Sequence, residues 1–265
     1  MNAVIQPPLP PLQLDDIESA DLLVGDSSDV NDWNTFMNLP TLGTPFTSVS
    51  VIGDEVFLYG GSNIKVKPGL MFDSYASTFF LLSVIDEAGC ITSVGGDAFS
   101  YCAVLTTVDL PACTIVYGSA DSPFLDYGGF GGCLTLSNLN IPLLEIIGDR
   151  AFRDCTSLLN VDFPLVTSVG LVAFLSCPSI NSVNLPLCTN IGNQCFQNSY
   201  LLTLINLPSC VNLGTTTELN YVFNGVIGNT ITATFNNVLQ TNNSGNPDGD
   251  IQELVANNTV TITYV

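Results

Sequence analysis

The stretch Ile147–Pro164, IGDRAFRDCTSLLNVDFP, decides the fold, because its pattern returns along the chain at a fixed interval. Two further copies follow it at steps of 22 residues. The same step separates three phenylalanines, Phe152, Phe174 and Phe196, and three prolines, Pro164, Pro186 and Pro208. An earlier copy is built around Phe99, and a longer one around Phe130 lies between. A sixth, degenerate copy runs from Leu213 to Phe223. Repetition of this length is typical of a solenoid.

The step from Phe99 to Phe130 is 31 residues, so this copy holds nine extra residues. They fall mostly in the glycine-rich stretch Ser119–Gly129. Repeat architectures place such insertions in loops on one face. We therefore expect a loop here and an uninterrupted stack beneath it.

Each copy carries the pattern Leu-x-x-Val-x-Leu-Pro, which predicts a short strand whose alternate residues point inward and which the proline ends. The preceding Ala-Phe-x-x-Cys segment places two apolar residues three apart, which favours a helical or 3₁₀ turn. One coil cannot bury its apolar face alone, so neighbouring coils should stack at about 4.8 Å. The sequence thus predicts a β-rich solenoid of five to six coils, with Phe152, Phe174 and Phe196 stacked as a spine.

The consensus I-G-x-x-A-F-x-x-C-x-x-L-x-x-V-x-L-P resembles the BspA-type (Treponema pallidum-type) leucine-rich repeats over about residues 91–214. This resemblance implies a leucine-rich-repeat solenoid, a β-rich α/β fold with a 22-residue repeat. It also implies a bacterial surface adhesin or a related binding protein. The family has no catalytic residues to carry over.

Four regions are expected along the chain. The first is an extended, acidic and proline-rich arm, and the second is a small β region that begins the stack, with a hairpin around Gly53. The solenoid follows, and a degenerate repeat with a C-terminal β cap ends the chain. The boundaries of these regions are 1–30, 31–90, 91–214 and 215–265.

Charge and composition exclude several classes of function. Four Lys and Arg against 24 Asp and Glu give a formal net charge of −20, which repels nucleic acid phosphates. No apolar run approaches the ~20 residues of a membrane-spanning helix. Histidine is absent, which removes Ser-His and Cys-His catalysis and most zinc sites. The chain is therefore predicted not to be an enzyme.

The nine cysteines are an odd number, and most of them fall on repeat positions. Cys102, Cys133, Cys155 and Cys177 share one core position, so we expect reduced, buried thiols one coil apart and neither bridges nor metal ligands. No cofactor is predicted. Asp248 and Asp250 flank Gly249 and resemble part of a calcium loop, although a simple turn accounts for them as well.

The outward positions of the predicted strands carry polar residues in columns. Such a ladder can bind a glycan or a protein at a host surface, and a merely solvated face has the same composition. The candidate binding residues are Asp109, Asn138, Asn140, Asn160, Asp162, Asn184 and Asn206.

The flanks resemble leucine-rich-repeat virion proteins of phages that infect Bacteroidetes. The resemblance rests on N-P-D-G-D-I-x-x-L from Asn246 to Leu254 and on N-N-T-V-T-I from Asn257 to Ile262. It implies a spike, fibre or capsid-surface component of the virion that attaches to the host. Residues 1–30 would then dock onto other virion proteins, and the chain would form a homo-oligomer.

Two alternatives remain at this point. One is a bacterial cell-surface adhesin, and the other is a purely structural minor capsid or cement protein. The first residues lack Lys and Arg and do not have the pattern of a secretory signal, which favours the virion over the cell surface.

Overall fold

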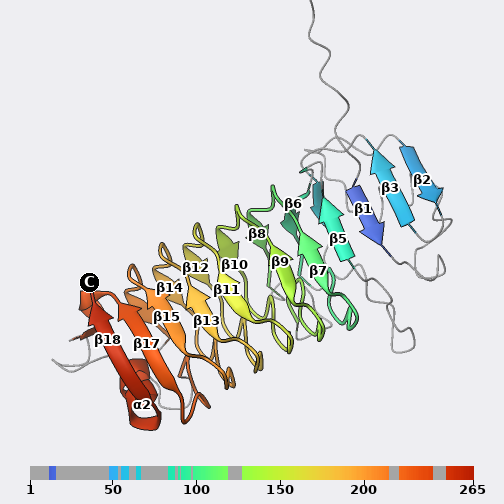
Figure 1. Cartoon of the computed structure of the whole chain (residues 1–265). Coiled ribbons are helices and arrows are strands. Elements are labelled where there is room, and N and C mark those ends of the chain that lie inside the picture. Colours follow the sequence, from blue (N-terminus) through green and yellow to red (C-terminus); the bar gives the residue numbers. More distant parts are fainter. Residues whose placement is uncertain are drawn as a thin grey trace, which may run out of the picture.

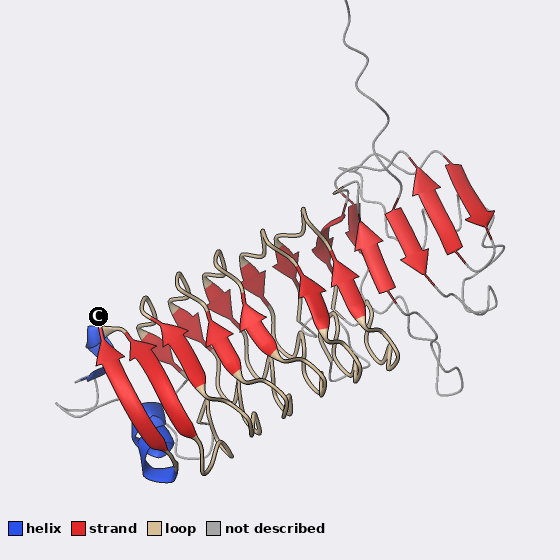
Figure 2. Ribbon diagram, viewed as in Figure 1, coloured by secondary structure: helices blue, strands red, loops and turns tan. Residues whose placement is uncertain are grey.

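The computed structural model describes residues 89, 91–96, 98–118, 127–214, 221–240 and 249–265, together with the strands that precede residue 89. The described coils stack side by side into an elongated body, with the C-terminal strands at one end and an antiparallel sheet at the other (Figure 1). Each repeat contributes one strand to a front layer and one to a back layer (Figure 2).

The front layer follows the Leu-x-x-Val-x-Leu pattern, as predicted. Its repeat strands are β7 (Thr107–Asp109), β9 (Asn138–Asn140), β11 (Asn160–Asp162), β13 (Ser182–Asn184) and β15 (Leu204–Leu207). Pairing is parallel and keeps the repeat step, since Val161 lies opposite Val183 and Val183 opposite Ile205. These central residues are fully buried, while their neighbours face outward.

The back layer consists of short strands, five of which follow the prolines of the repeats. They are β4 (Ile64–Val66), β6 (Ile91–Val94), β8 (Ile115–Val116), β10 (Ile146–Ile147), β12 (Ser168–Val169), β14 (Asn190–Ile191) and β16 (Asn212–Leu213). They form one seven-stranded sheet in coil order. The extra residues of the second copy therefore leave the pairing of β8 with β10 intact, because Ile115 still lies opposite Ile146.

The front layer is interrupted once. One six-stranded sheet ends at β9, and a five-stranded sheet begins at β11, so the two adjacent strands are not paired. At the same point Leu139 is only partly buried, whereas Val161 is fully buried. The repeat pattern did not predict this break.

A column of phenylalanines fills the centre of the stack. The predicted spine of Phe152, Phe174 and Phe196 is confirmed, and it extends to three further repeats. Successive ring centroids in the series Phe99, Phe130, Phe152, Phe174, Phe196 and Phe223 lie 5.2, 5.5, 5.2, 5.4 and 5.9 Å apart, with nearly parallel planes. Each ring is thus packed between the rings of the two neighbouring coils.

The Ala-Phe-x-x-Cys segments form single hydrogen-bonded turns. Cys155 N donates to Phe152 O at 3.3 Å, the three-residue spacing of the 3₁₀ alternative. The residue before the cysteine has a left-handed backbone, with φ of 60° at Asp154 and 58° at Ser176, and so does Asn198, which precedes Ser199 in the equivalent place, with φ of 65°. Gly132 and Gly225 occupy this position in other repeats, with φ of 79° and 81°. A left-handed residue ends a helical path, so each copy turns the corner within one short segment.

The N-terminal end of the front layer is an antiparallel extension. Strands β2 (Ser48–Ile52) and β3 (Glu55–Tyr59) form the hairpin that the sequence around Gly53 predicts. Strand β1 (Leu12–Asp15) lies between β3 and β5 (Ser83–Asp86) and pairs with both. This part of the expected arm is therefore a strand of the sheet, and the rest of residues 1–30 lies outside the described residues.

The C-terminal end extends the front layer by two longer strands, β17 (Thr230–Phe235) and β18 (Thr259–Tyr264), which pair in parallel. Between them come the 3₁₀ helix η3 (Asn237–Gln240) and the helix α2 (Gly249–Asn257). Ile251 and Leu254 of α2 are buried in the core. In the described part of the chain, no helix has the length and hydropathy needed to cross a membrane.

Candidate functional site

The candidate binding residues lie where the sequence placed them, on the outer face of the front strands. We call the column Asp109, Asn140, Asp162, Asn184 and Asn206 the ladder. Three hydrogen bonds link its members across coils: Asn140 Nδ2 donates to Asp109 Oδ1 at 2.8 Å, Asn184 Nδ2 to Asp162 Oδ1 at 2.8 Å, and Asn206 Nδ2 to Asn184 Oδ1 at 2.7 Å. Each amide therefore fixes the side chain of the preceding coil.

The ladder divides into two sections at the break between β9 and β11. Four of the predicted residues, two from each strand, flank this break. We call them the open quartet: Asn138, Asn140, Asn160 and Asp162. All four are exposed, whereas Asp109, Asn184 and Asn206 in the rest of the ladder are half-buried. The structure thus brings together four of the seven predicted residues as an accessible group.

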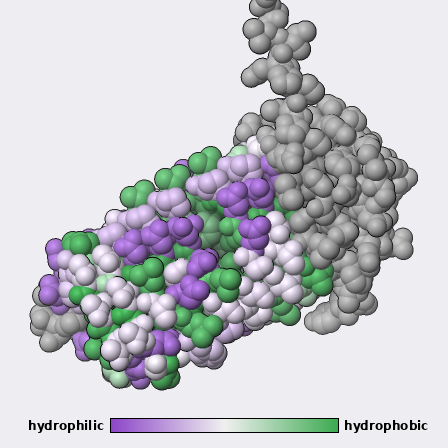
Figure 3. Space-filling view, in the orientation of Figure 1, coloured by the Kyte–Doolittle hydropathy of each residue, from purple (hydrophilic) through white to green (hydrophobic). Residues whose placement is uncertain are grey.

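The open quartet keeps unused hydrogen-bonding capacity. Asn160 Oδ1 accepts from Ser182 Oγ at 2.6 Å, and the ladder bonds occupy Asn140 Nδ2 and Asp162 Oδ1. Among the described contacts this leaves Asn138 Nδ2, Asn138 Oδ1, Asn140 Oδ1, Asn160 Nδ2 and Asp162 Oδ2 without a hydrogen-bond partner, which is two donor groups and three acceptors. Hydrophilic and apolar side chains are interspersed over the face of the molecule that includes these strands (Figure 3).

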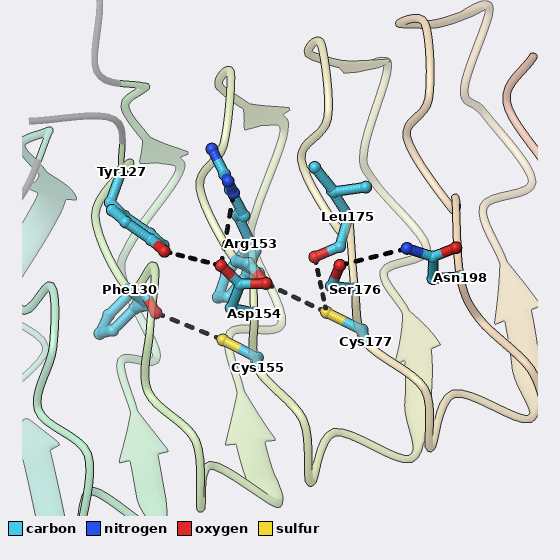
Figure 4. Close-up of polar contacts among 10 residues, drawn as sticks. Tyr127, Phe130, Arg153, Asp154, Cys155, Leu175, Ser176, Cys177 and Asn198 are labelled. Carbon is cyan, nitrogen blue, oxygen red and sulfur yellow. Dashed lines mark hydrogen bonds and ion pairs between the residues drawn. The ribbon is translucent and has the colours of Figure 1, made fainter. Parts of the chain in front are cut away.

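A second polar group, which the sequence analysis missed, lies beside the inserted stretch. Tyr127 donates from its hydroxyl to Asp154 Oδ2 at 2.7 Å, and the Arg153 guanidinium lies 5.0 Å from the centre of the Tyr127 ring (Figure 4). Arg153 Nε also lies 3.3 Å from Asp154 Oδ2, an ion pair without hydrogen-bond geometry. The Tyr101 ring packs on Tyr127 with centroids 4.6 Å apart.

These contacts give Tyr127 a structural role. Burial raises the pKa of its hydroxyl well above the usual range, and the hydrogen bond to the Asp154 carboxylate raises this pKa further. The phenol therefore stays protonated and remains a donor. Because Tyr127 lies near the end of the inserted stretch Ser119–Gly129, this contact fastens that end to the next coil. Arg153 and Asp154 occupy the two variable positions between the repeat's phenylalanine and cysteine, and their opposite charges were the available signal in the sequence.

The predicted cysteine column is confirmed as buried and unbridged. The thiols of Cys133, Cys155 and Cys177 each donate to the carbonyl oxygen of a phenylalanine one coil earlier, at 3.2 Å. Figure 4 shows the thiols of Cys155 and Cys177. Burial raises the pKa of the Cys102 thiol to about 12 and that of Cys188 to about 11. Such thiols are protonated at neutral pH and are poor nucleophiles.

Only one of the two residues of the suggested calcium loop, Asp250, belongs to the described residues. Asp248 lies outside the described residues. Asp250 is buried in the first turn of α2, and its carboxylate accepts a hydrogen bond from the backbone N–H of Val222. Its side chain thus joins α2 to the coil before it. Within the described residues, no cluster of three or more Cys, Asp or Glu has the arrangement to hold a metal ion.

The BspA type leucine rich repeat model matches residues 125–243 in six copies. The parallel pairings within this stretch step by 22 residues from β11 to β13 and from β13 to β15, and by 28 residues from β15 to β17. The fold is a leucine-rich-repeat solenoid. The match extends into the region 215–265, where a degenerate repeat was expected, and it includes β17.

Several solved structures are similar to this leucine-rich-repeat solenoid. A leucine-rich repeat protein from Bacteroides ovatus has 18% identity and a TM-score of 0.46, over 72% of this chain and 52% of that one. A leucine rich cell surface protein from Faecalibacterium prausnitzii has 18% identity and a TM-score of 0.44, over 65% and 41%. The leucine rich repeat protein of T. pallidum has 20% identity and a TM-score of 0.41, over 80% and 94%.

The alignment covers about half or less of the length of the first two of these proteins. No curated protein matches the chain.

Proposed function

We propose that this chain is a cell-surface binding protein of the BspA-like kind and that it contacts its ligand through the open quartet. The observation that carries the proposal is the grouping of Asn138, Asn140, Asn160 and Asp162, all exposed, at the break in the front layer. Their strands are held by the buried core beneath them, so the side chains start from a fixed backbone. A rigid site loses little conformational entropy on binding.

The ligand that fits this chemistry best is a glycan. Sugar hydroxyls both donate and accept hydrogen bonds, and the open quartet offers amide and carboxylate groups of both kinds within two neighbouring coils. The negative charge of the chain favours a neutral or cationic ligand over an anionic polymer. A protein partner at the host surface is the alternative outcome of the experiment below.

A virion component is the second candidate. It is favoured by the resemblance of Asn246–Leu254 and of the final strand to leucine-rich-repeat proteins of phages. In that case the N-terminal residues would contact other virion proteins, and the open quartet would face the host. Immunolabelling of intact producing cells supports the first candidate, whereas detection of the chain in purified particles by mass spectrometry supports the second.

The binding face is tested on an array of bacterial and mammalian cell-surface glycans. The variant Asn138→Ala/Asn160→Ala/Asp162→Ala should lose at least about tenfold in affinity for the glycans that the parent chain binds, because each lost polar contact contributes about 1 kcal/mol. The matched control is Asn190→Ala/Asn212→Ala on the back layer, where Asn212 Nδ2 donates to Asn190 Oδ1 at 2.5 Å and both side chains are exposed. This control should bind as the parent does.

Equal losses in both variants, or no binding of the parent to any arrayed glycan, would contradict the glycan proposal. Binding of the parent to protease-treated host cells separates the two ligand classes. Suppose that protease treatment of the cells abolishes binding of the parent, and that the quartet variant binds untreated cells as well as the parent does. The ligand is then a protein, and the site lies elsewhere.

A further inference from the structure

In the part of the chain that the structure describes, the front layer ends at β18, and this strand has no charge, proline or bulge to protect its edge. Among the described residues, β18 pairs with β17 alone. Its sequence, Thr259 to Tyr264, contains no charged residue and no proline, and its pairing with β17 is regular over six positions. Natural sheets usually block a free edge with charges, prolines or bulges. An edge without them is able to pair with another strand.

The backbone groups that face this edge can be assigned from the bonds on the other side. Val265 N donates to Phe235 O at 3.0 Å, Asn237 N donates to Val265 O at 2.9 Å, and Thr259 N donates to Asn229 O at 2.9 Å. Since alternate residues of a strand direct their groups to the same side, Thr261 and Thr263 also face β17. The N–H and C=O groups of Val260 and Ile262 therefore point to the open side.

The core face of β18 is incompletely covered as well. The inward side chains of β17, such as Ile231 and Ala233, are fully buried. Those of Val260 and Ile262 pack against the core but stay partly exposed. One further strand beside β18 would cover them in the way that β18 covers β17.

We propose that this strand is β18 of a second copy, paired antiparallel about a two-fold axis through Thr261. In this register Val260 lies opposite Ile262 of the other copy, and each such pair exchanges two hydrogen bonds, so that the four edge-facing groups of Val260 and Ile262 in each copy are satisfied. Apolar side chains meet apolar ones on the core face, and threonines meet on the outer face.

A second copy fits this edge for an electrostatic reason too. Each chain carries a formal net charge of −20, so two copies can approach closely only through an uncharged surface. The strand from Thr259 to Tyr264 is such a surface, and under two-fold symmetry the same strand serves on both sides. The interface is one strand wide, below the ~1,200 Å² of a standard complex. The dimer is therefore weak and reversible, and it joins two solenoids end to end.

The register is tested by cysteine trapping. Thr261 is exposed, and at the two-fold axis its Cβ would lie about 4.5–5.5 Å from its counterpart, within reach of a disulfide. Thr261→Cys should therefore form a disulfide-linked dimer at least about tenfold faster than Thr263→Cys. Thr263 is equally exposed, but its counterpart would lie about 13 Å away along the strand. The parent chain, treated with the same oxidant, is the control that shows how much disulfide-linked dimer the native cysteines form.

Equal rates for the two variants overturn the proposed pairing. A second measurement is sedimentation equilibrium at up to about millimolar concentration, where the parent should dimerise. Thr261→Asp places two carboxylates opposite each other and should abolish the dimer, whereas Thr263→Asp faces Thr259 and should not. A parent that stays monomeric, or a Thr261→Asp variant that dimerises as the parent does, overturns the proposal.

Discussion

The ring centroids of Phe152 and Phe174 lie 5.2 Å apart, and the two planes are inclined by only 5°. Phe174 meets Phe196 in the same way on its other side, at 5.4 Å. Both rings are fully buried. A change at Phe174 therefore removes contacts with two coils at once, and its effect reaches in both directions along the solenoid.

Phe174→Ala should lower the free energy of unfolding by about 3–5 kcal/mol, through the lost transfer energy and the cavity that remains. Chemical denaturation monitored by circular dichroism measures this. Phe174→Leu fills most of the cavity and should cost roughly half as much. A loss below 1 kcal/mol for the alanine variant would contradict the central position of the spine.

Gly170→Ala should be strongly destabilising. A Cβ atom at Gly170 would lie 2.5 Å from Asp149 N and 2.6 Å from Gly148 C, in the backbone of the adjacent coil. Since that backbone cannot move without opening the stack, we expect a loss of about 3 kcal/mol or more. Gly249→Ala is the matched control, because its Cβ would meet only the Tyr221 side chain at 3.5 Å. Its thermal unfolding should match that of the parent.

Ser176→Gly should be stabilising, because Ser176 has a left-handed backbone and the equivalent positions hold Gly132 and Gly225. Relief of the strain of a non-glycine residue contributes about 1–2 kcal/mol, part of which the more flexible unfolded chain offsets. A net gain of about 0.5–1 kcal/mol is expected in thermal unfolding. Ser179 has no positive φ, so Ser179→Gly should lower the free energy of unfolding by about the same amount. Equal effects at both serines would contradict this account.

The buried thiols predict a loss of stability at alkaline pH. Burial raises the pKa of Cys102 from 9.0 to about 12 in the folded chain, so between these values the unfolded state has lost a proton that the folded state keeps. Stability is therefore fully present below pH 9 and falls as the pH rises, by about 1 kcal/mol per pH unit for each such thiol. In Cys102→Ala this contribution is absent.

The measurement is urea denaturation of the parent and of Cys102→Ala at pH 8 and pH 10. The stability difference between the two proteins should shrink by about 1 kcal/mol at the higher pH. The cost of Phe174→Leu, which removes no ionisable group, should be the same at both. A pH-independent cost for Cys102→Ala would show that the thiol titrates normally.

The sequence predicted those features that repeat. The interval between Phe152 and Phe174 implies that the two rings stack, and the shared position of Cys133 and Cys155 implies a buried column, because both follow from the step and from burial alone. The outward direction of Asn138 and Asp162 follows from the alternation of a strand in the same way.

Features that depend on contacts between dissimilar segments could not be predicted in this manner. Asn138–Asn140 fits the repeat as well as Asn160–Asp162 does, so no local pattern indicates that β9 and β11 fail to pair. Strand β1 has short-range signals of an extended segment, but its place between β3 and β5 depends on two partners far along the chain. Tyr127 is likewise a lone aromatic residue until Asp154 is brought beside it.

The inserted stretch of the second repeat leaves the register of the back layer unchanged, since Ile115 lies opposite Ile146 on one side and Ser93 on the other. We therefore expect that the number of residues between Gly118 and Tyr127 can vary without disturbing the stack. The condition is that the end of this segment stays attached to the next coil, as the hydrogen bond from Tyr127 to Asp154 attaches it. For evolution, and equally for protein engineering, we expect that foreign peptides placed between Gly118 and Tyr127 can be displayed and exchanged while the register of the solenoid is kept.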